Sequence, residues 1–151
     1  MSDNGTGSRN INIYYAAPLF NEIERRSNED MARRLRAYGF TVYLPQETGR
    51  VSEGMSREDC FCKDLTALNH TDVVIADLRG RVPDEGTVWE IGYAYGHGRP
   101  VIAFVDEHSF INGHQNNMIE QGCNVLWNET PTEESFNDFT EEIINLAKNC
   151  A

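Results

Sequence analysis

Five short apolar runs alternate along the chain with longer segments in which apolar residues recur at helical spacing. The runs cover residues 11–16, 40–44, 72–77, 100–105 and 123–127. The third, Asp72-Val-Val-Ile-Ala-Asp77, is apolar throughout its centre, as is typical of a strand covered on both faces. Alternation of strands with helices favours a parallel sheet. The pattern therefore predicts one α/β domain with a doubly wound, five-stranded parallel sheet of the flavodoxin or Rossmann type.

The helical segments carry recognisable start and stop signals. The first runs from Asn21 to Gly39 and is expected to bury a stripe of Ile23, Met31, Leu35 and Tyr38. The next two span residues 56–69, with Phe61, Leu65 and Leu68 inward, and residues 86–97. Thr132 with Glu134 is expected to open the last helix. Residues 46–56 predict a mobile loop, and residues 106–122 an irregular excursion.

Composition and charge narrow the class of function. The 151 residues include 24 acidic and 13 basic side chains, which gives a net charge of −11. Such a chain repels nucleic-acid backbones and anionic membranes, so neither is expected as a partner. Residues 1–10 are polar and predict a flexible tail without a signal peptide, which leaves 11–151 as the domain and favours the cytoplasm.

Motifs for the common cofactors do not occur in the sequence. No Gly-x-Gly-x-x-Gly follows the first strand, and there is no Gly-x-x-x-x-Gly-Lys-Ser/Thr loop. Cys60-x-Cys62 is not a usual zinc spacing, so we expect free thiols and no metal. In parallel sheets, ligands bind at the carboxyl ends of the strands. The candidates are therefore the residues that follow the strands, such as Gln46 and the segment 77–85.

The acidic segment that leads into the third helix allows two interpretations. Thr87 and Glu90 match a Ser/Thr-x-x-Glu capping box, which is an ordinary helix start. Alternatively, Asp84 and Glu90 converge on the cleft, where a carboxylate can act as a nucleophile. Other single residues are equally ambiguous: Asp64 is solvated or catalytic, and Tyr14 belongs to the core or to the site.

Taken together, several segments resemble the nucleoside 2-deoxyribosyltransferase family. They are Ile13-Tyr-Tyr-Ala-Ala-Pro-Leu-Phe20, Asp64-Leu65, Asp72-Val-Val-Ile-Ala-Asp77, Asp84-x-Gly-x-x-x-Glu90-Ile-Gly-Tyr-Ala94 and Asn116-x-Met118. The resemblance implies exchange of the base of 2′-deoxyribonucleosides with retention, with no metal or organic cofactor. It implies that Glu90 is the nucleophile, that Tyr14 orients it, and that Asp64 exchanges a proton with the base.

The resemblance also implies substrate-binding roles. Asp84 would bind the 5′-hydroxyl of the deoxyribose, together with Asn116 from a neighbouring subunit of a homo-oligomer. Phe20 and Met118 would flank the base or sugar, and Gln46 would contact a base edge. The partners are then small deoxynucleosides and free bases.

Two departures from the family pattern leave the preferred base open. The sequence ends Asn-Cys-Ala151 without the tyrosine that some members place in the site, and Leu19 replaces an aromatic residue next to Phe20. Two other functions stay open. One is hydrolysis of 2′-deoxynucleoside 5′-monophosphates by the same glutamate, and the other is a non-catalytic nucleotide-binding domain.

Overall fold

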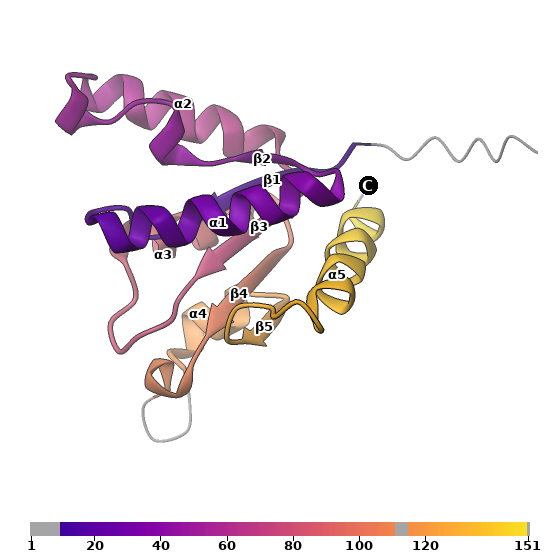
Figure 1. Cartoon of the computed structure of the whole chain (residues 1–151). Helices are drawn as coiled ribbons and strands as arrows, with labels where there is room; N and C mark the ends of the chain where they lie inside the picture. The colour runs from indigo at the N-terminus through magenta and orange to yellow at the C-terminus, as the bar shows by residue number, and fades with distance from the viewer. Residues whose placement is uncertain (1–9, 111–114, 151) are drawn as a thin grey trace, which may run out of the picture.

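A five-stranded parallel sheet forms the centre of the molecule, with its strands in the order β2-β1-β3-β4-β5 (Figure 1). The computed structural model describes residues 10–110 and 115–150, so the predicted tail lies almost wholly outside the described residues. The strands are β1 (Asn12–Ala16), β2 (Thr41–Tyr43), β3 (Val73–Asp77), β4 (Val101–Val105) and β5 (Val125–Asn128). The predicted doubly wound α/β architecture is confirmed.

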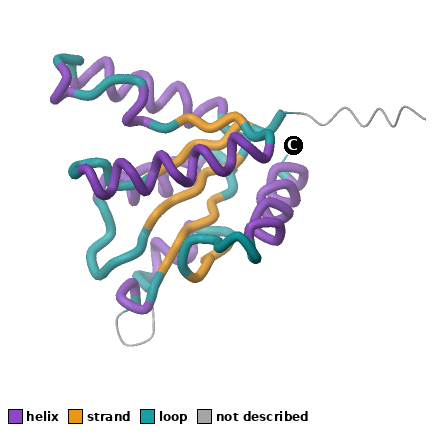
Figure 2. Tube along the Cα trace, viewed as in Figure 1, coloured by secondary structure: helices purple, strands orange, loops and turns teal. Residues whose placement is uncertain are grey.

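Helices cover both faces of the sheet, as Figures 1 and 2 show. One face packs against α1 and α5, and the other packs against α2, α3 and α4. The helices are α1 (Glu22–Tyr38), α2 (Arg57–His70), α3 (Glu85–Gly96), α4 (Asn117–Gly122) and α5 (Phe136–Asn149). Within the described residues, none of them is both long and apolar enough to span a bilayer.

The first helix begins and ends where the sequence predicts. The side chain of Asn21 accepts a hydrogen bond from the backbone N–H of Glu24, and the Glu24 carboxylate accepts one from the N–H of Asn21. Gly39 ends the helix with a left-handed φ of 119°, a conformation that glycine adopts without steric cost. Met31 and Leu35 are buried against the sheet, as expected.

Other expectations are wrong in detail. Ile23, expected in the buried stripe of the first helix, is 83% exposed. Phe61 is 52% exposed instead of buried. Residues 106–122 are not wholly irregular, because they include α4 and a 3₁₀ turn at Glu107–Ser109. Likewise, the loop after β2 contains two 3₁₀ turns, Pro45–Glu47 and Val51–Glu53.

The last helix begins at Phe136, later than expected. Two reciprocal hydrogen bonds join Thr132 and Ser135 before the helix begins. The Thr132 N–H donates to Ser135 Oγ at 2.9 Å, and the Ser135 N–H donates to Thr132 Oγ1 at 3.2 Å. These bonds close a turn in front of the helix, so the capping signal read at Thr132 belongs to that turn.

The strand order fixes where a ligand can bind. From β1 the chain crosses one face through α1 to β2, and from β2 it crosses the other face through α2 to β3. The loops after β1 and β3 therefore leave the sheet on opposite faces. In open α/β sheets this switch point is the usual ligand crevice.

Candidate active site

A tyrosine from the sheet holds a glutamate from α3 at the switch point. Tyr14 lies in β1 with no exposed surface, and its hydroxyl donates a hydrogen bond of 2.6 Å to Oε1 of Glu90. So short a bond is typical of a charged acceptor. Tyr14 is thus a core residue that also bonds a candidate site residue, so the two interpretations of its position are compatible.

The first turn of α3 is capped by Asp84, so of the two interpretations of this segment the capping box of Thr87 and Glu90 is wrong. Oδ2 of Asp84 accepts hydrogen bonds from the Thr87 N–H at 2.8 Å and from Thr87 Oγ1 at 3.0 Å. Thr87 is therefore inside the helix, and Glu90 lies in its second turn. As a result, Glu90 is not needed for capping and its side chain reaches Tyr14.

A second tyrosine holds the second candidate carboxylate. Asp64 on α2 is partly buried, and its Oδ1 accepts a hydrogen bond of 2.9 Å from the Tyr43 hydroxyl. The Tyr43 and Tyr14 rings are stacked, with centroids 5.3 Å apart and an interplanar angle of 19°. Tyr43 was not among the predicted site residues. No sequence motif marks it, because only the register of β1 and β2 sets it opposite Tyr14.

Both carboxyl groups titrate above their ordinary range. Burial raises the pKa of Glu90 to about 7, and the charges of Asp64 and Asp84 act in the same direction, while the Tyr14 hydrogen bond opposes them. Burial also raises the pKa of Asp64 against the hydrogen bond from Tyr43. Burial and the neighbouring Glu90 raise the pKa of Tyr14, so it stays protonated and acts as a donor. Raised carboxyl pKa values in a cleft are typical of acid–base chemistry near neutral pH.

Glu90 and Asp64 open on one cleft of about 410 Å³ between α2 and α3. Its lining residues are Phe61, Asp64, Leu65, Leu68, Glu85, Gly86, Trp89 and Glu90. Phe61 and Trp89 meet edge to face, with centroids 5.8 Å apart, and make an aromatic wall beside the carboxylates. A larger hollow of about 730 Å³ lies alongside α2, but Glu90 and Asp64 do not line it. We therefore place the chemistry in the smaller cleft.

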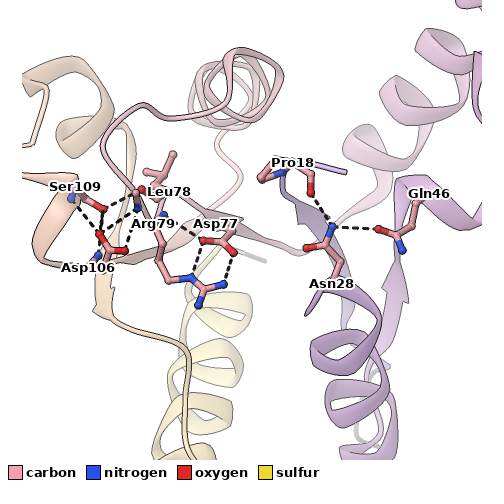
Figure 3. Close-up of polar contacts among 9 residues, drawn as sticks. Pro18, Asn28, Gln46, Asp77, Leu78, Arg79, Asp106 and Ser109 are labelled. Atoms are coloured by element: carbon pink, nitrogen blue, oxygen red, sulfur yellow. Dashed lines mark hydrogen bonds and ion pairs between the residues drawn. The ribbon is translucent and has the colours of Figure 1, made fainter. Parts of the chain in front are cut away.

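Polar contacts fix the loops at this edge of the sheet (Figure 3). Oδ1 and Oδ2 of Asp106 each accept a hydrogen bond of 3.1 Å from the Gly80 N–H, and Ser109 Oγ donates to the Leu78 carbonyl at 2.9 Å. Arg79 donates two hydrogen bonds from its guanidinium group and one from its backbone N–H to Asp77. These contacts hold the segment that leads into Asp84 and Glu90.

Gln46, expected to contact a base edge, is engaged within the protein. Its Nε2 donates to the Arg25 carbonyl and to Glu29. Its Oε1 accepts from the amide of Asn28, which also donates to the Pro18 carbonyl (Figure 3). Gln46 is only 7% exposed. In this arrangement it links α1 to the loop after β2, and it is not among the residues that line the cleft.

Three other predicted residues lie outside the cleft of their own chain. Asn116 caps α4, with Oδ1 accepting hydrogen bonds from the Met118 and Ile119 N–H groups. Met118 is 81% exposed and Phe20 is 76% exposed. The structure therefore brings Asp64 and Glu90, each with its tyrosine partner, to one cleft. Asp84 lies near enough for its charge to raise the pKa of Glu90, but it is bonded to Thr87 and does not line the cleft, and neither do Asn116, Met118 and Phe20.

The fold and site define a flavodoxin-like α/β protein with two tyrosine-held carboxylates at its switch point. The family model for nucleoside 2-deoxyribosyltransferases matches residues 13–137, and the chain belongs to that family. A 2-deoxyribosyltransferase of Bacillus psychrosaccharolyticus has a similar structure, with a TM-score of 0.68 and 29% sequence identity over 85% of this chain and 89% of that one.

Other similar proteins are named for different activities. A Thermofilum pendens protein, named for a proposed 2′-deoxynucleoside 5′-phosphate N-hydrolase activity, is 28% identical over 97 residues. That alignment covers 62% of this chain and 66% of the relative, just under two thirds of its length. A CMP N-glycosidase of Clostridium botulinum shares the fold, with a TM-score of 0.62 and 22% identity over 87% of this chain and 98% of that one. The proteins that resemble this chain are thus named for transferase activity in some cases and for N-glycoside hydrolysis in others.

Proposed function

We propose that the protein is a nucleoside 2-deoxyribosyltransferase that exchanges the base of 2′-deoxyribonucleosides through a covalent deoxyribosyl ester on Glu90. The observation that carries this proposal is the pairing of Glu90 with Asp64 in one cleft, each held by a tyrosine hydroxyl. Cleavage of a glycosidic bond needs a carboxylate next to the anomeric carbon and an acid at the leaving group. The two carboxyl groups supply one of each.

The proposed exchange needs only the nucleoside, a second base and the two carboxyl groups. Tyr14 occupies Oε1 of Glu90, so Oε2 forms the new bond to C1′ of the sugar. The C1′–N bond breaks, its electron pair goes to the base, and Asp64 donates a proton to a base nitrogen. A second base then attacks C1′, the C1′–Oε2 ester bond breaks with its electron pair returning to the Glu90 carboxylate, and the incoming base gives a proton to Asp64. Two displacements at C1′ restore the original configuration.

The helix cap supports a nucleoside as the substrate in preference to a nucleotide. A helix N-terminus attracts phosphate, but at α3 the Asp84 carboxylate already accepts the Thr87 N–H. Arg79, which follows β3, is bound to Asp77. A 5′-phosphate at this end of the site would lie against a carboxylate in a chain of net charge −11. An uncharged 5′-hydroxyl can donate a hydrogen bond to Asp84.

Nucleotide hydrolysis is the second candidate, with the Thermofilum relative and the exposed Arg81 of the loop before α3 in its favour. A product assay distinguishes base exchange on nucleosides from hydrolysis of nucleotides. Purified protein is incubated with deoxyinosine and free adenine, or with deoxyinosine monophosphate alone, and the products are resolved by liquid chromatography. We expect deoxyadenosine from the first mixture and little free base from the second. Fast release of hypoxanthine from the nucleotide, without exchange in the first mixture, would reject the transferase.

The exposed positions of Asn116 and Met118 support a further part of the proposal, that they complete the cleft of a neighbouring copy in a homo-oligomer. Glu90→Ala and Asn116→Ala chains, each nearly inactive, are mixed under conditions in which subunits exchange. Activity should reappear, because some mixed sites combine an intact Glu90 with an intact Asn116. Proven exchange of subunits without recovery would mean that each chain builds its own site.

A further inference from the structure

Tyr43 links the two carboxylates of the site, although the sequence motifs assign it no role. It lies opposite Tyr14 in the register of β2 and β1, and its ring stacks on the Tyr14 ring. Each tyrosine donates its hydroxyl to a different carboxylate, Tyr14 to Glu90 at 2.6 Å and Tyr43 to Asp64 at 2.9 Å. The stacked pair therefore fixes where the two reacting groups stand relative to the sheet.

The Tyr43 hydroxyl has one proton and two acceptors within reach. Oδ1 of Asp64 is 2.9 Å away and Oγ1 of Thr48 is 3.0 Å away. The proton of Thr48 is directed to the Pro45 carbonyl, at 3.0 Å. Tyr43 can thus donate to Asp64 when that carboxyl is ionised and turn to Thr48 when it is protonated. Burial raises the pKa of Tyr43 to about 12, so the hydroxyl keeps its proton near neutral pH.

We propose that Tyr43 is the positioning residue for Asp64, holding Oδ1 so that Oδ2 carries the transferable proton, and bonding the carboxylate that remains when the base takes that proton. The inference rests on the proposed function, because it concerns the proton that Asp64 exchanges with the base. As the C1′–N bond breaks, the proton leaves Oδ2 and negative charge grows on Asp64. A donor already aimed at that charge stabilises the transition state more than the ground state.

Substitution of Tyr43 by Phe distinguishes a positioning role of its hydroxyl from a purely structural role of its ring. Tyr43 also packs against the core on the α2 and α3 face of the sheet, where its ring contributes apolar contact. Tyr43→Phe keeps that ring and its stacking on Tyr14 and removes only the hydroxyl. Tyr93→Phe is a matched control, because it removes the hydroxyl of a tyrosine on α3 that donates to Asn69 on α2 and to neither carboxylate.

The first measurement is the titration of Asp64 by carbon NMR in wild type and in both variants, which needs no activity. Loss of a hydrogen bond to the charged form raises a carboxyl pKa. We expect the pKa of Asp64 to rise by about one unit in Tyr43→Phe, since hydrogen bonds to charged groups are worth about that much. It should stay unchanged in Tyr93→Phe. An unchanged titration in Tyr43→Phe would overturn the inference.

The second measurement compares two leaving groups. Deoxyadenosine needs protonation of its base, whereas 7-methyldeoxyguanosine carries a cationic base that leaves without a proton. In Tyr43→Phe, kcat should fall about tenfold on deoxyadenosine, which corresponds to one hydrogen bond, with the pH profile moved to higher pH. Release of 7-methylguanine should be nearly unchanged. Equal losses on both substrates would overturn the inference, whereas a wild type that neither exchanges nor releases bases would reject the proposed function itself.

Discussion

Glu90→Gln is expected to lose base exchange by about a thousandfold or more, because the amide oxygen is a far weaker nucleophile than a carboxylate oxygen. The substitution keeps the size of the side chain, and its amide oxygen can still accept the Tyr14 hydrogen bond that Glu90 accepts at 2.6 Å. The fold should therefore be intact. The rate of deoxyadenosine formation from deoxyinosine and adenine measures the loss.

Glu85→Gln is the matched control, because Glu85 lies five residues earlier in α3 and also lines the cleft, whereas the hydrogen bond from Tyr14 goes to Glu90. We expect it to keep most of its activity. If Glu90→Gln stayed within about tenfold of wild type, a nucleophilic Glu90 would be untenable, since the loss of a reacting group costs far more than that.

The same substitution should stabilise the protein at alkaline pH. Burial raises the pKa of Glu90 from 4.5 to about 7, so the folded state binds a proton more tightly than the unfolded chain does. This contribution to stability is fully present below about pH 4.5 and is lost as the pH rises through 7. Gln does not titrate, so its contribution to stability does not change with pH. The unfolding free energy of the variant minus that of wild type should therefore be about 1–3 kcal/mol larger at pH 8 than at pH 4.5.

Urea unfolding of both proteins at pH 4.5 and pH 8 measures this difference. Glu141→Gln serves as the control, because Glu141 is an exposed glutamate on α5, away from the site. A stability difference between Glu90→Gln and wild type that did not change with pH would show that Glu90 is not held in a desolvated position. Activity and stability should thus change in opposite directions at this one residue, as expected where a site is kept at a cost to the fold.

The fold was predictable because its signals are local and repeated. The core of β3, Val74-Ile-Ala76, is wholly buried, so its unbroken apolar run predicts a strand covered on both faces. Strands of this kind alternate with helices that begin at good caps, such as Asn21 and Ser56. The wrong helix-start prediction concerns a local signal that fits two positions equally well. Asp84 and Thr87 are both good N-caps three residues apart, and the sequence pattern alone does not decide which one starts α3.

The site was predictable only in part, because its geometry depends on register and packing. Glu90 and Asp64 stood out as carboxylates in suggestive positions, and the structure places them on one cleft. Tyr43 gave no comparable signal, because its contact with Asp64 depends on how β2 aligns with β1 and on where α2 lies. Gln46 was predicted to contact a base, but its side-chain amide is hydrogen-bonded to residues of α1. No sequence pattern connects those residues to Gln46.

The central claim is that Glu90 forms a covalent bond to the sugar, and trapping that ester tests it most directly. A 2-fluoro-2-deoxynucleoside is suitable, because fluorine withdraws electrons from the cation-like transition state and slows the breakdown of the ester. After incubation and digestion, mass spectrometry should find one added fluorosugar on the peptide that contains Glu90, and none in Glu90→Gln. A label on another residue, or base release with no label at all, would contradict the account.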